Sequence, residues 1–179
     1  MKLSEIYAIL NEVAPKKLSD EFCLAANGYD NSGVLVDCNE DIRGVVFTLD
    51  LTAAAIERAK QLGANLIVTH HPAIYGKIGN VLAGDESTVG DKLVKCMRNG
   101  ISVVSMHLNL DAARGGIDES LMQGVCRAAG GEAQGDTALM YALSEGGYGR
   151  VYNLPQTTLG ALAEGIKKEQ SSNFDAFCV

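Results

Sequence analysis

The sequence predicts an α/β fold: a parallel βαβαβ core sheet flanked by helices, followed by a smaller mixed β extension. The main observation is a set of near-continuously apolar segments, which is typical of strands buried on both faces of a parallel sheet. These segments are residues 44–50, 65–69 and 101–105. The second observation is that stretches with helical periodicity separate them, as in βαβ units. The third is the length of 179 residues, which suits one domain with a small appendage.

The first predicted element is a helix that ends before Pro15, because apolar residues recur there at helical spacing. Those residues are Leu3, Ile6, Leu10 and Val13. Residues 27–33 are dense in turn-forming residues and predict a loop. A short strand is expected at 34–36.

Three helices are expected inside and after the parallel unit, at residues 52–62, 89–98 and 118–129. Thr52 is a suitable N-cap for the first of them, and Gly63 a suitable C-terminal stop. The pair Asn99-Gly100 should end the second.

The later part of the chain has a different character. Residues 138–143 and 150–154 predict two strands joined by the glycine-rich segment 145–149, followed by a helix at 157–168. Residues 175–179 resemble the start of a strand that stops, so we expect a chain truncated at its C-terminus. The predicted domains are therefore a metal-site α/β domain at 1–135 and an incomplete extension at 136–179.

Composition narrows the functional class. The formal net charge is −7, with 15 Lys plus Arg and no basic stripe, which argues against a nucleic-acid partner. No apolar run is long enough to cross a bilayer, and no secretory signal core is present. The five cysteines are scattered without a CxxC pair, as expected for reduced thiols in a soluble, cytoplasmic protein.

The chemistry-bearing residues gather after the predicted strands. His70, His71 and His107 are the only histidines, and Asp111 follows His107 by four positions. Open α/β sheets place ligands beyond the carboxyl ends of their strands, and imidazole with carboxylate suits Zn, Fe or Mn. We therefore predict that His70, His71 and Asp111 bind divalent metal. Pro72 favours extended geometry at His71, so the adjacent rings could serve two ions.

Several residues have more than one interpretation. For His107 a structural role is as compatible as a ligand role. Asp50 ends the strand before Thr52, and a helix-entry role is favoured over a ligand role. Asp30 and Asn31 could contact a ligand or cap a loop. Gly115-Gly116 and Gly146-Gly147 could cradle phosphate, although turn chemistry is favoured for the second pair.

Four motifs, in order along the chain, resemble the Nif-three-like family. They are Tyr-Asp-Asn-Ser-Gly (29–33), Val-Thr-His-His-Pro-Ala-Ile-Tyr (68–75), Ser-Met-His-Leu-Asn-Leu-Asp-Ala-Ala-Arg-Gly-Gly-Ile-Asp (105–118) and Gly-Tyr-Gly-Arg (147–150) with Leu-Pro (154–155). This family is also described as dinuclear metal centre, hexameric proteins and as "GTP cyclohydrolase I type 2 homologues". The similarity runs from the first helix nearly to the last residue.

The resemblance implies a two-metal site held by His70 and His71, with Asp111 bridging both ions and His107 at or near the cluster. It also implies toroidal homohexamers with the sites facing an inner cavity. Two departures stand out: Tyr29 replaces the usual Trp, and the family's C-terminal His and Glu ligands, spaced four apart, have no counterpart because no histidine follows His107.

These observations lead to two functional hypotheses. The first is a metal-dependent hydrolase with up to two Zn, Fe or Mn ions, acting on a small, nucleotide-like substrate through metal-activated water. The alternative is a non-catalytic, ring-forming scaffold that binds metal or a partner. The GTP cyclohydrolase label comes from the family's name only, since no base-recognition residues can be identified in the sequence.

Overall fold

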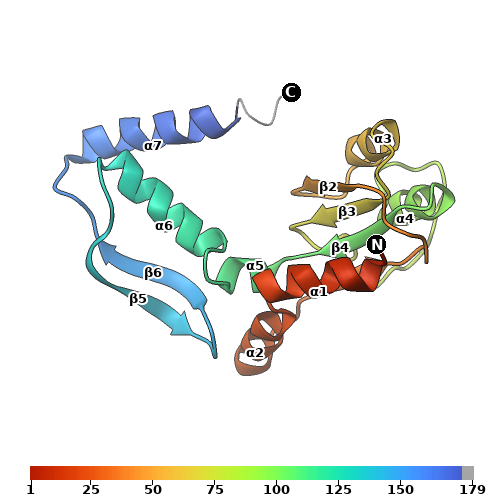
Figure 1. Cartoon of the computed structure of the whole chain (residues 1–179), viewed down its shortest axis with the longest axis horizontal. Helices are drawn as coiled ribbons and strands as arrows, with labels where there is room; N and C mark the ends of the chain where they lie inside the picture. The colour runs from red at the N-terminus through yellow and green to blue at the C-terminus, as the bar shows by residue number, and fades with distance from the viewer. Residues whose placement is uncertain (175–179) are drawn as a thin grey trace. The chain divides into compact units, whose positions relative to one another are not determined.

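The computed structural model describes residues 1–174, and it confirms the predicted α/β class (Figure 1). The strand start expected at 175–179 lies outside the described residues. By their internal contacts the residues form two compact units, Met1–Leu110 and Asp111–Val179. Each unit is described by itself.

The first unit contains a four-stranded sheet in the order β1-β4-β3-β2. Strands β2 (Val45–Thr48), β3 (Leu66–Thr69) and β4 (Ser102–Ser105) are parallel, which confirms the predicted βαβαβ unit. Strand β1 (Gly33–Val36) pairs antiparallel with β4 at the sheet edge. The sequence predicted this strand but not its partner.

Helices α3 (Ala53–Gln61) and α4 (Val89–Arg98) are the crossovers between the parallel strands. Both begin at a threonine N-cap, with Thr52 accepting a hydrogen bond from an amide of α3 and Thr88 from one of α4. Gly63 adopts a φ of +67° after α3, and Gly100 a φ of +62° after α4. These are the predicted helix ends, where glycine accommodates a left-handed backbone.

A hydrophobic core fills the side of the sheet that α3 and α4 cover, and it includes Ile56, Ile67, Leu93 and Val103. All residues of β3 and β4 are buried, as expected for central parallel strands. The prediction of a buried strand at 44–50 was wrong for β2, where Phe47 is 69% exposed. The position of β2 at the sheet edge explains the difference, because an edge strand has a neighbour on one side only.

The N-terminal helix α1 (Leu3–Val13) matches its prediction. A second helix, α2 (Lys16–Ala26), was not predicted from the sequence. Pro15 ends the apolar pattern of α1 but also serves as the N-cap residue of α2, a helix end where proline is well tolerated. Only Leu18 and Ser19 of α2 are buried, so it lacks a broad apolar stripe.

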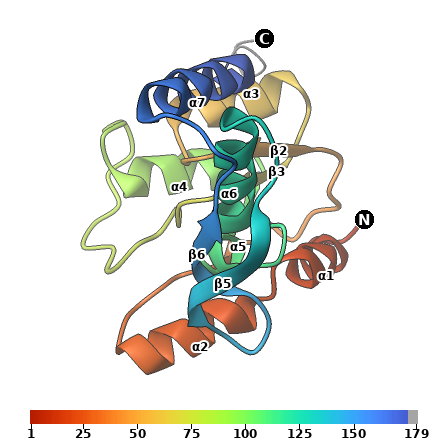
Figure 2. The same ribbon diagram turned by 90° about the vertical axis from the view of Figure 1, so that its left-hand side faces the viewer.

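The second unit begins within the short helix α5 (Leu108–Ala112) and continues with α6 (Ile117–Ala128). The two predicted strands, β5 (Gln134–Ala142) and β6 (Gly147–Asn153), pair antiparallel, and α7 (Leu159–Phe174) follows. Helix α6 contacts both β6 and α7 (Figure 1, Figure 2). The compact unit thus includes α6. The division into a domain at 1–135 and an extension of the same fold at 136–179 stays a prediction.

No helix among residues 1–174 is both long and apolar enough to cross a membrane.

Candidate metal centre

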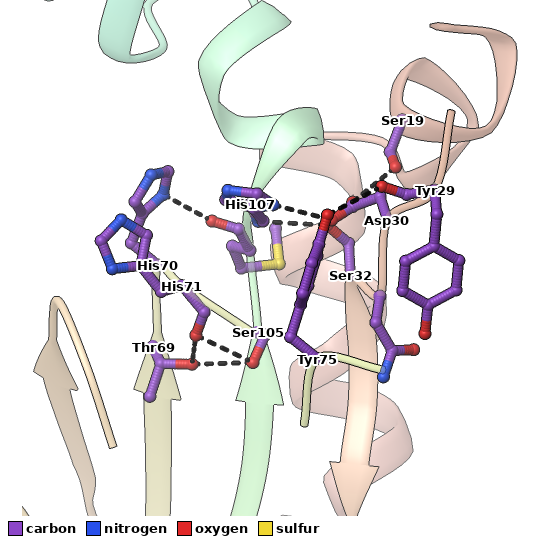
Figure 3. Close-up of polar contacts among 12 residues, drawn as sticks. Ser19, Tyr29, Asp30, Ser32, Thr69, His70, His71, Tyr75, Ser105 and His107 are labelled. Carbon is purple, nitrogen blue, oxygen red and sulfur yellow. Dashed lines mark hydrogen bonds and ion pairs between the residues drawn. The ribbon is translucent and has the colours of Figure 1, made fainter. Parts of the chain in front are cut away.

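The site is built on the carboxyl ends of β3 and β4 (Figure 3). The last residues of these strands, Thr69 and Ser105, share a hydrogen bond of 2.7 Å between their hydroxyls. Thr69 also bonds to the carbonyl of His71, and Ser105 accepts the amide of Ala73. Both hydroxyls therefore fix the backbone that carries the two adjacent histidines.

Hydrogen bonds to the end of β2 orient that backbone further. The amide of His70 donates to the carbonyl oxygen of Thr48 at 3.1 Å, and the amide of His71 donates to that of Leu49, the residue after β2, at 2.9 Å. These bonds continue the β2–β3 ladder beyond the strand ends. The double histidine is thus an extension of the sheet and not part of a free loop.

Each of the three imidazoles uses its Nδ1 atom for a hydrogen bond to protein. His70 Nδ1 lies 2.9 Å from the carbonyl oxygen of Met106, and His71 Nδ1 lies 2.8 Å from Asp50 Oδ1. His107 Nδ1 lies 2.7 Å from Asp30 Oδ1. Because a carbonyl or carboxylate oxygen only accepts, each Nδ1 carries a proton, and in a neutral imidazole the lone pair is then on Nε2.

Asp30 is the best-connected carboxylate of the site. Its side chain is 2% exposed, and its Oδ2 accepts hydrogen bonds from Ser19 at 2.6 Å and from Ser32 at 2.5 Å. Burial acts to raise the pKa of the Asp30 carboxyl, but the hydrogen bonds from Ser19, Ser32 and His107 outweigh it and lower this pKa. Asp30 is therefore an anion that fixes the tautomer and orientation of His107, as partners of metal-binding histidines do.

His70, His107 and Asp111 form a group that could hold a metal ion, with one ligand atom from each lying within 4.8 Å of the others. All three are half-buried. Asp111 lies one helical turn after His107 along α5, where the amide of Leu110 bonds to the carbonyl of His107 at 2.8 Å. Short-range helix geometry therefore brings this carboxylate toward the His107 imidazole.

This donor set fits a divalent transition metal. It combines imidazole nitrogens, whose rings are oriented by acceptors at Nδ1, with a carboxylate oxygen. Zn, Fe and Mn take such mixed N/O ligands, whereas Mg and Ca prefer oxygen alone. The candidate group contains three side chains, so positions would remain for water or substrate.

Not every residue that was predicted to bind metal belongs to this three-residue group. His71 lies outside the three-residue group, although its ring centroid is 5.0 Å from that of His70 and 5.9 Å from that of His107. Thr52 caps α3 as predicted. Asp50, for which a helix-entry role was favoured, accepts a hydrogen bond from His71 through its carboxylate.

The loop before β1 adds residues whose role the sequence left open. Asp30 acts as a hydrogen-bond acceptor of the site, and Asn31 donates to the carbonyl of Ile74 at 2.8 Å. Next to them, the rings of Tyr29 and Tyr75 meet edge to face with centroids 5.5 Å apart. Both tyrosines are more than half exposed. Tyr29 directly precedes Asp30 and Tyr75 follows His71 by four positions (Figure 3).

The two glycine pairs are turns. The amide of Gly115 donates to Glu119 Oε2 at 2.9 Å, so it is occupied within the protein. Gly146 and Gly147 have φ values of +85° and +147°, which agrees with the turn favoured for this pair.

A comparison with protein families identifies the relatives of this chain. The model of Duf34/NIF3 (NGG1p interacting factor 3) matches residues 1–176. The chain belongs to the Duf34/NIF3 family. The resemblance seen in the sequence motifs is thereby confirmed.

Individual Duf34/NIF3 relatives agree. The chain is 33% identical over 124 residues to a GTP cyclohydrolase 1 type 2 homolog of Clostridium perfringens, a match covering 69% of this chain and 44% of the relative. It is 30% identical over 171 residues to the homolog of Clostridium acetobutylicum, covering 94% of this chain and 59% of the relative. Reduced HcgD from Methanocaldococcus jannaschii superposes with a TM-score of 0.73 at 27% identity, covering 94% of this chain and 60% of that one. The chain thus spans about half the length of the curated relatives it matches.

Proposed function

We propose that this protein is a metal-dependent hydrolase whose centre is formed by His70, His107 and Asp111. The observation that carries the proposal is the convergence of their ligand atoms within 4.8 Å at the carboxyl ends of parallel strands. All three Nδ1 atoms are bound to protein acceptors, so Nε2 is the nitrogen through which each imidazole would bind a metal ion. We include His71 as a fourth ligand, since its ring lies beside that of His70.

A divalent ion held there would polarise a carbonyl or phosphoryl oxygen and lower the pKa of water for attack. The protein contributes orientation. Asp30 holds the His107 ring, the Met106 carbonyl holds the His70 ring, and the strand-end hydroxyls fix the backbone between them. The exposed Tyr29–Tyr75 pair, formed by residues near Asp30 and His71 in the sequence, would offer an apolar surface to a planar substrate.

Further features belong to the same proposal. We expect a homohexamer with up to two ions per chain and a small, nucleotide-like substrate, in line with the family resemblance. A cytoplasmic location is supported by the free thiols of Cys23, Cys38, Cys96 and Cys126 among the described residues.

Metal analysis of this chain tests the proposal. The protein is purified without a chelating tag, reconstituted separately with Zn, Mn and Fe(II), and dialysed before elemental analysis. Asp111→Asn removes the carboxylate while keeping its shape. Asp37→Asn is the matched control, because Asp37 only accepts an amide of its own turn.

Near-stoichiometric metal in the wild type and in Asp37→Asn, with a sharp loss in Asp111→Asn, would support the centre. Ester, amide and cyclic-nucleotide substrates would then be screened for turnover that depends on the added metal. A wild type that holds no metal would refute the centre. Bound metal that maintains the oligomer without any turnover would favour the scaffold alternative.

A further inference from the structure

A second feature of the protein is a cavity of about 330 Å³ in the second unit. It lies among the start of α6, β5 and β6, and its volume is within the range of small-molecule sites. The lining residues that matter for its chemistry are Arg114, Glu119, Met122, Leu139, Gly146 and Arg150.

Arg150 is a partly buried guanidinium held in a fixed orientation. Its Nη1 donates to the carbonyl oxygens of Gly147 at 2.8 Å and Gly149 at 3.3 Å. Both hydrogen bonds come from Nη1, so the N–H groups on Nη2 and Nε of the guanidinium remain as donors for a ligand. No carboxylate among the described side chains pairs with it.

Arg114 supplies a second guanidinium on the same lining. It is exposed and forms neither a hydrogen bond nor an ion pair with the described side chains. Glu119 is the one acidic residue among the lining side chains, and its Oε2 is bound to the amide of Gly115 at 2.9 Å. The lining thus carries two guanidinium groups and one carboxylate, so its formal charge is positive. The whole chain, by contrast, has a net charge of −7.

A locally positive wall in an acidic protein selects anions, and arginine matches the planar oxygens of phosphate and carboxylate groups. The remaining wall includes the apolar side chains of Met122 and Leu139, which suit the body of an organic molecule. We infer that this cavity binds the oxyanion group, phosphate or carboxylate, of a small organic molecule.

The cavity begins beside a residue of the candidate metal centre. Arg114 follows Asp111 by three positions, so their Cα atoms are at most about 11 Å apart. Gly146 packs directly on the end of α5, where an added Cβ would lie 2.2 Å from the carbonyl oxygen of Ala112. A substrate of the proposed hydrolase is one candidate for the molecule bound here. This role as a substrate pocket rests on the proposed hydrolase function, whereas binding itself needs neither metal nor turnover.

The test measures binding of phenyl phosphate and of benzoate to the metal-stripped chain of 179 residues by isothermal titration calorimetry at constant ionic strength. Arg114→Gln removes one guanidinium that has no structural partner. Arg150→Lys keeps the charge but removes the planar fork. Arg58→Gln is the matched control, because Arg58 is an exposed arginine of α3 in the other unit.

We expect saturable binding of at least one probe, weakened about tenfold by Arg114→Gln, which is typical for a lost hydrogen bond to a charged group. Arg150→Lys should weaken binding as well, while Arg58→Gln should leave the Kd unchanged. The tighter probe identifies phosphate or carboxylate as the natural group. No saturable binding of either probe, or equal affinity in wild type and Arg114→Gln, would overturn the inference. Because no metal is present, either result is independent of whether the metal centre binds its ion.

Discussion

Replacing Asp30 by Asn tests the link between the buried carboxylate and the metal centre. The substitution keeps the size of the side chain but removes its charge. Asp30 Oδ1 accepts from His107 Nδ1 at 2.7 Å, and the carboxylate is 2% exposed, so solvent cannot replace the lost interaction. The hydroxyls of Ser19 and Ser32 can rotate to accept from the new amide, which should preserve the fold.

The expected magnitude follows from two independent comparisons. A hydrogen bond to a charged group contributes about 1.5–3 kcal/mol and a neutral one about 0.5–1.5 kcal/mol. The substitution should therefore weaken the hydrogen bond that orients the His107 ring by roughly 1–1.5 kcal/mol. Measured changes to outer partners of metal-binding histidines weaken metal affinity about 10–100-fold. Since 1.4 kcal/mol corresponds to about tenfold, the two comparisons meet near tenfold.

The assay is a competition titration of Zn against a fluorescent chelator for wild type, Asp30→Asn and Asp41→Asn. Asp41 is the control because it is exposed, pairs with Lys2 and precedes β2, at the opposite end of the strands from the histidines. Asp30→Asn should raise the Kd for Zn about tenfold, and Asp41→Asn should not change it. Equal affinity of wild type and a folded Asp30→Asn protein would refute the argument that Asp30 orients a metal ligand.

Three further predictions concern stability. Ile67→Ala should lower the free energy of unfolding by about 2–5 kcal/mol in urea titrations, because Ile67 is fully buried in the core and the substitution leaves a cavity; a loss below about 1 kcal/mol would contradict this packing. Gly146→Ala should lower the melting temperature, because Gly146 has a φ of +85° and its added Cβ would strike a backbone carbonyl; an unchanged melting temperature would count against that contact. Hydrogen bonds from the Gly84 amide and Lys95 lower the pKa of Asp91 below its ordinary value of 3.8. The ionised carboxylate therefore stabilises the fold above that value, and this stabilisation is lost as the pH falls through the lowered pKa. Asp91→Asn should therefore flatten the acid side of the stability–pH curve, and parallel wild-type and variant curves would show that Asp91 does not contribute.

Local sequence determined most of the elements of this protein and the place of its candidate site, with helix α2 as the exception. Apolar runs and helical periodicity specify strands and helices over short distances, and Thr52 and Gly63 mark helix ends through their own side-chain and backbone preferences. The adjacency of His70 and His71 and the four-residue spacing of His107 and Asp111 likewise bring candidate ligands together through local geometry.

Tertiary structure decided which side chains support the site and which strands face solvent. The acceptor of His107 is Asp30, which lies 77 residues away along the chain, and no local pattern indicates that pairing. The same holds for β1, whose antiparallel pairing with β4 depends on a contact between distant segments. The exposure of Phe47 follows from the edge position of β2, because an apolar strand has the same sequence pattern whether one neighbour or two flank it. Strand order, burial and hydrogen-bond partners are properties of the packed chain, whereas the sequence specifies only the preferences of its parts.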